Sequence, residues 1–160
     1  MFYGFISIIG IFLGLIIANY TKEELKAGKK YFIILEVILL ATLIITTIKF
    51  NFNYLLFIFG LILGFIIRYE YFYFGISIIN TITNKDYNFL VSSLVFLYSL
   101  PFGTLLFKKD LKILIPQLTL FFITIILYFF KYNLLSIASG ALVSLVLLKI
   151  NSLLNFRFKH

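Results

Sequence analysis

The sequence contains no cysteine and no tryptophan, and its only histidine, His160, is the last of its 160 residues. The lack of cysteine excludes disulfides, thiolate nucleophiles, and zinc or iron–sulfur sites with cysteine ligands. One terminal histidine adds no cluster of metal ligands. We therefore expect neither a metal site nor a cofactor.

Charged residues are also scarce. They make up 12% of the chain, whereas a soluble domain carries roughly a quarter. Hydrophobic residues make up 62%, and the mean hydropathy is +1.10. At 18.6 kDa the chain has room for a single domain, residues 1–160. The composition predicts an all-α integral membrane protein, and the bias toward Ile, Phe, Lys, Asn and Tyr is typical of a prokaryote with an AT-rich genome.

A helix needs about 17 to 20 apolar residues to cross a bilayer. Five segments approach or exceed this length, the last at the short end: residues 2–19, 31–48, 89–107, 111–130 and 133–148. Residues 54–83 leave two alternatives open, because one helix of about 45 Å is too long for an upright span. Either one tilted helix ends near Ile79, or two short spans turn at Arg68.

The basic residues provide a second criterion, because lysine and arginine in short loops are retained on the cytoplasmic side. With seven spans and the N-terminus outside, only Lys49, Lys85 and Lys131 lie outside and the other eleven basic residues lie inside. With six spans, Arg68 is within the membrane and the others divide six against seven. The charges therefore predict a polytopic bundle of seven transmembrane helices, with the C-terminus inside, and six spans as the alternative.

The chain also shows weak self-similarity at an offset of 79 residues. This shift places Lys29-Lys30 on Lys108-Lys109, and residues 53–56 on residues 132–135. The match predicts a 3+1+3 internal repeat, in which units 1–67 and 89–150 are joined by a linker span over residues 69–83. With seven spans the two units run parallel, an arrangement that occurs in transporters. Chance alignment of apolar segments is the alternative.

Glu36 is an acidic residue within the second predicted span, where a carboxylate costs roughly 2 to 3 kcal/mol near mid-helix. Its functional interpretation is a proton or cation site. Its structural interpretation is an acid near the interface that reaches water or pairs with Lys29 or Lys30. Arg68 and Glu70 likewise allow two interpretations. A turn would place both in the headgroup layer, whereas a buried Arg68 would pair with Glu36 or bind an anion.

Small residues and prolines mark further candidate positions. The spacing of Gly10 with Gly14 and of Gly60 with Gly64 favours close helix packing, as does a small-residue run around Gly140. Pro101 and Pro116 fall within predicted spans, where proline frees backbone carbonyls. Uncharged polar residues lie near them, and the candidates for a binding site are Glu36, Arg68, Ser99, Pro101, Pro116 and Gln117. The alternative is that both prolines serve packing alone.

Two short stretches resemble known membrane families. Ile115-Pro116-Gln117 resembles the dipeptide of the PQ-loop sugar transporters, whose 3+1+3 arrangement is similar to the predicted one. Residues 98–103, Tyr-Ser-Leu-Pro-Phe-Gly, look like a stretch of the bacterial acyl-phosphate glycerol-3-phosphate acyltransferases. The first unit lacks the PQ dipeptide, and the phosphate loops of the acyltransferases are missing. Neither resemblance assigns the chain to a family or carries residue roles over.

No motif in the sequence fixes a reaction or a substrate. We expect a small transporter or permease for a solute or ion, with a site near Glu36, Pro101 and Gln117. An accessory subunit of a membrane complex and a lipid-modifying transferase are the alternatives. As partners we expect the lipid bilayer, anionic headgroups at the loop lysines, and a homo-oligomer or membrane complex. Nucleic acid is not expected, because the net charge of +8 is dispersed over short loops.

Overall fold

The computed structural model describes residues 2–21, 25–106, 111–127 and 134–157. Within these residues the chain forms seven helices and no strand, so the all-α prediction is confirmed. The helices are α1 (Phe2–Tyr20), α2 (Leu25–Phe50), α3 (Tyr54–Ile66), α4 (Glu70–Thr81), α5 (Lys85–Leu106), α6 (Leu111–Leu127) and α7 (Leu135–Arg157).

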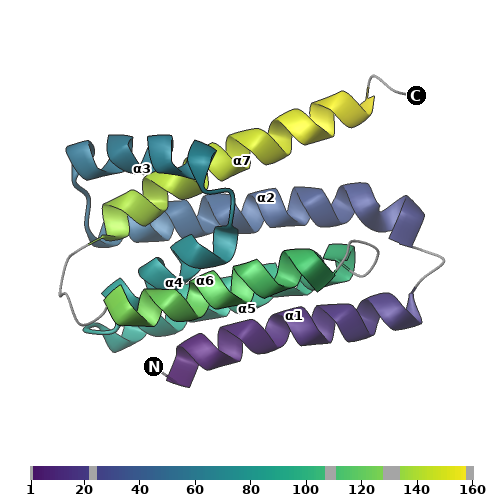
Figure 1. Cartoon of the computed structure of the whole chain (residues 1–160), viewed down its shortest axis with the longest axis horizontal. Coiled ribbons are helices and arrows are strands. Elements are labelled where there is room, and N and C mark those ends of the chain that lie inside the picture. Colours follow the sequence, from purple (N-terminus) through teal and green to yellow (C-terminus); the bar gives the residue numbers. More distant parts are fainter. Residues whose placement is uncertain (1, 22–24, 107–110, 128–133, 158–160) are drawn as a thin grey trace.

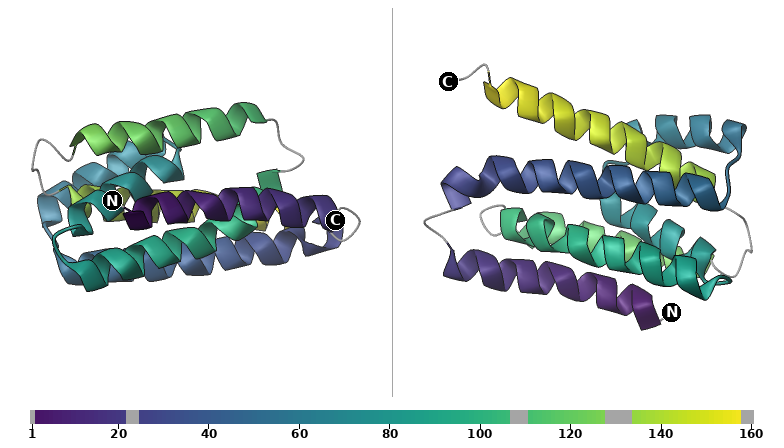
Figure 2. Two further views of the ribbon diagram at one scale, coloured as in Figure 1. Left: turned by 90° about the horizontal axis from the view of Figure 1, so that it is seen from below. Right: turned by 180° about the vertical axis from the view of Figure 1, so that it is seen from behind.

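Five long helices lie along one another, and the shorter α3 and α4 occupy only one half of the bundle (Figures 1 and 2). We call the end that holds the start of α1 and the α2–α3 and α4–α5 connections the N-terminal end. The opposite end, where α1 and α7 end, is the C-terminal end. Helices α1, α5 and α7 run toward the C-terminal end, and α2 and α6 run back (Figure 1).

Three helical segments are long and apolar enough to cross a membrane: Gly28–Phe50, Lys85–Leu106 and Leu135–Leu154. The prediction of seven spans is therefore met only in part by length and composition. The remaining apolar helices are shorter, and they include Gly4–Tyr20 and Lys112–Ile126. Large apolar side chains are exposed on the outside of the bundle, for example Phe5, Ile16 and Ile66.

Residues 54–83, for which the sequence left two alternatives open, form two helices with a turn at residues 67–69. The alternative of a single tilted helix was therefore wrong. Asn53 caps the start of α3, because its side-chain oxygen accepts hydrogen bonds from the amides of Leu55 and Leu56 at 3.1 and 3.2 Å. Ile67 and Tyr69 have extended backbone conformations that break the helix. Helices α3 and α4 measure about 20 and 18 Å, so together they form a hairpin that enters from the N-terminal end and returns to it (Figure 1).

The predicted glycine faces bring two pairs of helices into backbone contact. On α1, a Cβ atom added at Gly10 would lie 2.5 Å from the carbonyl oxygen of Phe96 in α5, and Gly14 also faces α5. On α3, a Cβ atom at Gly64 would lie 2.5 Å from the carbonyl oxygen of Ala141 in α7. Gly60 and Gly140 face each other's helices in the same pair. All of these close approaches occur within one chain.

The remaining helices are arranged less symmetrically. Helix α2 packs against α5 and α7, whereas α6 packs mainly against α4. The directions of α1 to α3 match those of α5 to α7, as two parallel units would require (Figure 1). The neighbours of α2 and α6 differ, however, so the 3+1+3 repeat stays a prediction.

Candidate functional site

Lys149 of α7 is the centre of a buried charged cluster. Its ammonium group forms an ion pair with Glu36 of α2, lies 3.3 Å from Oε1 of Glu70 in α4, and donates to the hydroxyl of Tyr98 in α5 at 2.5 Å. An ammonium has three N–H donors, so these three oxygens match its hydrogen-bonding capacity. The side chains of Lys149, Glu36 and Glu70 are 17%, 3% and 10% exposed.

Gln117 of α6 fixes the second carboxylate of the cluster. Its amide nitrogen donates to Oε2 of Glu70 at 2.9 Å, and its amide oxygen accepts from the backbone N–H of Tyr71 at 3.1 Å. Glu70 is the first residue of α4, where the helix dipole favours negative charge. One buried amide side chain therefore joins α6 both to the carboxylate and to the start of α4.

Aromatic side chains enclose the cluster. The ammonium of Lys149 lies 4.9 Å from the ring centre of Tyr98 and 5.8 Å from that of Phe102, within the range of cation–π attraction. The Tyr71 ring lies 5.3 Å from that of Phe102. The Tyr71 hydroxyl donates to Ser99 at 2.6 Å, and Ser99 donates to a backbone carbonyl within α5. The aromatic shell is thus itself held by hydrogen bonds.

The ion-paired residues Glu36 and Lys149 lie at the same distance from the N-terminal end of the bundle. Glu36 precedes the end of α2, Phe50, by 14 residues, and Lys149 follows the start of α7, Leu135, by 14 residues. Each is therefore about 21 Å from the N-terminal end, at 1.5 Å per residue. The turn between α3 and α4 reaches a similar depth. The charges consequently meet where the hairpin ends, nearer to the C-terminal end.

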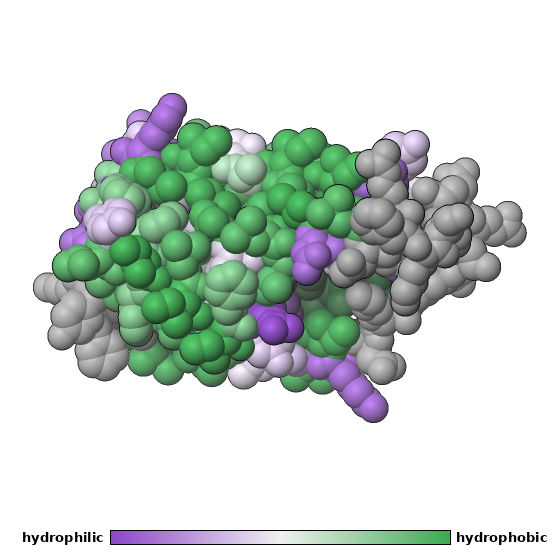
Figure 3. All heavy atoms as spheres, turned by 90° about the horizontal axis from the view of Figure 1, so that it is seen from above, coloured by the Kyte–Doolittle hydropathy of each residue, from purple (hydrophilic) through white to green (hydrophobic). Residues whose placement is uncertain are grey.

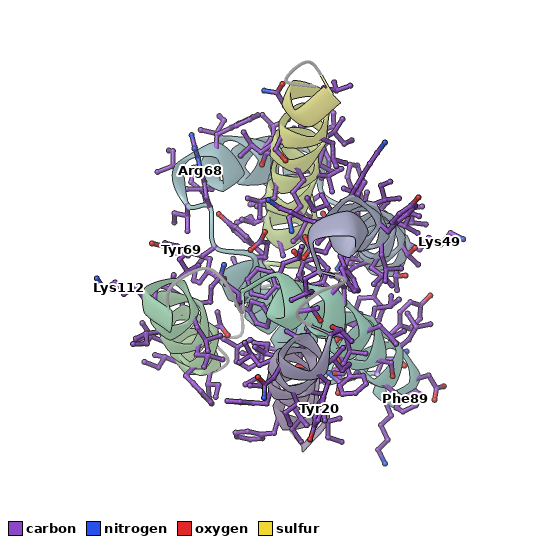
Figure 4. All side chains as sticks on the ribbon, turned by 90° about the vertical axis from the view of Figure 1, so that its right-hand side faces the viewer. Tyr20, Lys49, Arg68, Tyr69, Phe89 and Lys112 are labelled. Carbon is purple, nitrogen blue, oxygen red and sulfur yellow. The ribbon has the colours of Figure 1, made fainter. Side chains whose placement is uncertain are left out.

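A cavity of about 290 Å³ adjoins the cluster in the half of the bundle that the hairpin does not fill. Figure 4 looks along the bundle from the C-terminal end and shows Arg68 and Tyr69 at the turn, between α3 and α6. Figure 3 shows the face over α3 and α7 as largely hydrophobic, with hydrophilic residues beside a hollow partway along it. The polar residues that line the cavity are Lys29, Glu36, Arg68, Glu70, Gln117, Lys149 and Ser152.

The structure brings three of the predicted binding residues to this cavity: Glu36, Arg68 and Gln117. Ser99 lies outside it and is connected to it through Tyr71. Pro101 and Pro116 lie inside continuous helices, α5 and α6, next to Phe102 and Gln117 in sequence. Neither proline lines the cavity.

The structure places the charged candidates Glu36, Arg68 and Glu70 in defined contacts. The turn at Arg68 does not expose Glu70, because this residue as a whole is 7% exposed and is bonded to Gln117 and Lys149. Tyr71, the next residue in α4, is fully buried. Glu36 forms an ion pair with a lysine, Lys149 of α7. The Nε of Arg68 donates to the carbonyl oxygen of Phe65 at 3.3 Å, which closes the end of α3.

Sequence reasoning missed Lys149, Tyr98 and the part played by Glu70. Lys149 was assigned to the loop beyond the last span, because hydropathy falls after Leu148. A signal was present, since Ile150, Leu153 and Leu154 continue the apolar pattern at helical spacing, and α7 extends to Arg157. Tyr98 carried no signal of this kind, because a tyrosine in an apolar span is usually interpreted as a residue that packs against other helices.

Among the described residues there is no group of three or more histidine, aspartate and glutamate side chains placed to hold a metal ion. The cluster contains two carboxylates, one ammonium, one amide and one phenol. Such a set can bind a cation, a proton or a polar solute. Comparisons with protein-family models, curated proteins and solved structures found no match to the chain.

Proposed function

We propose that this chain is a multi-pass membrane protein that moves a small solute or ion through a site built on Glu36, Glu70, Gln117 and Lys149. The observation that carries the proposal is the buried cluster itself, to which α2, α4, α5, α6 and α7 each contribute a side chain. Charged groups inside a lipid-embedded bundle are costly and typically mark a transport pathway or a proton relay.

The broken hairpin supports a transport function. A backbone turn at membrane depth is tolerated where it is covered by protein or lines a water-filled cavity, and here the turn at Arg68 lines the cavity. Discontinuous helices of this kind form substrate sites in many transporters. In this proposal five helices cross the membrane fully, and α3 and α4 cross it only in part.

The basic residues support one orientation. Lys29, Lys30 and Lys112 lie near the C-terminal end, whereas Lys49 and Lys85 lie at the N-terminal end. The cytoplasmic side retains the larger number, so the proposal places the C-terminal end and the cavity on the inside. Single cysteines at Lys85 and Lys112 test this in a chain without native cysteine. A membrane-impermeant thiol reagent should label the first in intact cells and not the second, and the reverse pattern would overturn the orientation.

Flux through proteoliposomes tests the transport function. Purified protein is reconstituted, and proton movement is followed with an enclosed pH dye while uptake of labelled Na⁺ is measured in parallel. Wild-type protein should carry one of these fluxes, and Glu36→Gln should abolish it. Thr119→Ala is the matched control, because Thr119 is exposed on α6 and bonds only within its own helix. Equal flux in Glu36→Gln and wild type would remove Glu36 from the pathway.

A lipid-modifying transferase is the second candidate, because the basic residues Lys29 and Arg68 line the cavity and could hold a phosphate headgroup. Mass spectrometry of lipids from expressing cells would show a new species that depends on both residues if this candidate is right. An accessory subunit has less support, because the glycine faces that suggested it are occupied within the chain. Co-purification in fixed ratio with other membrane proteins would restore that alternative.

A further inference from the structure

The cavity beside the charged cluster is lined by more positive than negative charge. Lys29, Arg68 and Lys149 contribute +3, and Glu36 and Glu70 contribute −2, so the lining has a net charge of +1. The ammonium of Lys149 already lies between the two carboxylates. A ligand with one negative charge would neutralise the lining, so the cavity favours an anion over a cation.

Arg68 is the basic residue of this lining that has hydrogen-bond donors to spare. Its side chain is exposed at the turn, and it forms no ion pair with any residue that the structure describes. Its Nε donates to the carbonyl oxygen of Phe65 at 3.3 Å, which leaves the four N–H groups of its two terminal nitrogens. These groups form a planar fork that matches two oxygen atoms of one phosphate group. Arg68 is therefore suited to hold an anion on the wall of the cavity.

The remainder of the lining is largely apolar, as a lipid ligand requires. The cavity extends from Glu36, about 16 Å along α2, to the last residue of α5, Leu106, and the third residue of α6, Ile113. The apolar residues of the lining are Ile33, Phe102, Leu105, Leu106 and Ile113. A ligand in the cavity would contact both charged and hydrocarbon side chains, which matches the junction of the headgroup and the acyl chains in a lipid.

The position of α6 leaves the cavity accessible from the side of the bundle. Helices α6 and α7 both line the cavity, through Gln117 and Lys149, but α6 packs mainly against α4. Figure 4 shows α6 set apart from α7, with the turn at Arg68 between α3 and α6. Figure 3 shows hydrophobic surface around the hollow over α3 and α7. In a bilayer this face would meet lipid, so a lipid could reach the cavity between α6 and α7.

We propose that this cavity binds the phosphate group of an anionic phospholipid, with Arg68 as the ligand of the phosphate. A phosphodiester carries one negative charge, which balances the net charge of the lining, and the apolar residues contact the hydrocarbon beside it. The proposal goes beyond the transport of a small solute, because it assigns a lipid to the cavity with or without a flux, and it assigns no reaction to that lipid. A soluble phosphate ester presents the same oxygen atoms, so the experiment separates these two sources.

Thermal unfolding of the purified protein tests the proposal. Detergent micelles contain either phosphatidylglycerol or phosphatidylcholine with the same acyl chains. Phosphatidylglycerol should raise the unfolding temperature of the wild-type protein by roughly 5 °C more than phosphatidylcholine does. Arg68→Gln should lose this difference. The matched control Lys112→Gln should keep it, because Lys112 is exposed on α6 and does not line the cavity, although the variant loses the same charge.

Three outcomes of this experiment would overturn the proposal: an equal rise with both lipids, an unchanged response in Arg68→Gln, or a loss of the difference in Lys112→Gln as well. Glycerol 3-phosphate added to phosphatidylcholine micelles tests the soluble source. If it raised the unfolding temperature as much as phosphatidylglycerol does, and only when Arg68 is present, the lipid would be the wrong occupant. Flux in proteoliposomes is measured separately, so the lipid site can fail while the transport function stands.

Photocrosslinking locates the lipid without reference to stability. A photoreactive phenylalanine analogue replaces Ile113, which lines the cavity, or Ile115, which is 65% exposed on the same helix and does not line it. In membranes with equal amounts of both lipids, position 113 should crosslink severalfold more phosphatidylglycerol than phosphatidylcholine, and position 115 should show no preference. Arg68→Gln should remove the preference at position 113. Equal crosslinking of the two lipids at position 113 in the presence of Arg68 would contradict the proposal.

Discussion

The bundle joins its helices in two different ways. In the pairs α1–α5 and α3–α7, glycines bring the backbone of one helix close to the backbone of the other. Helix α6 is held differently, because its Gln117 reaches Glu70 and the start of α4 through hydrogen bonds. Backbone contacts leave no room for one helix to shift against another, whereas flexible polar side chains can exchange partners. The glycine-packed pairs form a rigid frame, whereas the charged cluster is held by side-chain hydrogen bonds and ion pairs.

The largest effect is expected from breaking the rigid frame at Gly60. A Cβ atom at this position would lie 2.8 Å from the Cα of Ile137 in α7, so Gly60→Val forces α3 and α7 apart. We expect a loss of about 3 kcal/mol or more in the free energy of unfolding, measured as a lower unfolding temperature in detergent.

Gly28→Ala is the control for this substitution. A Cβ atom at Gly28 would meet only the flexible ring of Phe32, at 3.4 Å. Alanine also favours the helix by roughly 0.5 to 1 kcal/mol. If Gly60→Val and Gly28→Ala had equal stability, the close approach of α3 and α7 would not hold the frame together.

The frame could be predicted from sequence more fully than the site. Apolar runs located α1, α2, α5 and α6, and the interruption at Arg68 located the turn between α3 and α4. These features depend on local hydropathy and on spacing within one segment. The contact of Glu36 with Lys149 joins residues 113 apart in the chain, and no local pattern encodes it. The hydropathy pattern also placed the end of the last predicted span before Lys149. A lysine lowers the mean hydropathy of a segment even where its side chain is buried and paired.

The second prediction compares Lys149 with Glu70 in the charged cluster. Lys149→Met leaves Glu36 and Glu70 as two buried carboxylates without their ammonium, and we expect a loss of about 3 kcal/mol in low salt. Glu70→Gln leaves Lys149 paired with Glu36, so we expect a loss of only about 1 kcal/mol. Thermal unfolding of both variants in choline chloride measures the difference. Equal losses of stability in the two variants would show that Glu70 contributes as much as Glu36 to the stabilisation of the buried ammonium.

The third prediction concerns the link between α6 and the hairpin. Gln117→Ala removes a donor from Glu70 and leaves the buried N–H of Tyr71 without its acceptor, which costs about 2 kcal/mol. Thr119→Ala, on the exposed side of the same helix, should cost nearly nothing. Hydrogen exchange should also speed up at the first amides of α4 in Gln117→Ala. Unchanged exchange there would mean that α6 does not position the hairpin.

The smallest effect tests whether the aromatic shell belongs to the frame or to the site. Tyr71→Phe keeps the ring packed on Phe102 and removes only the hydrogen bond to Ser99, so we expect a loss of about 1 kcal/mol. Ser99 keeps its own bond to Val95, and thus no buried donor is orphaned. If Tyr71→Phe nevertheless abolished ion flux while the protein stayed folded, the Tyr71 hydroxyl would act with the cluster. Unchanged flux would place Tyr71 in the frame, because a residue that only packs can lose its hydroxyl without altering the charges at Lys149.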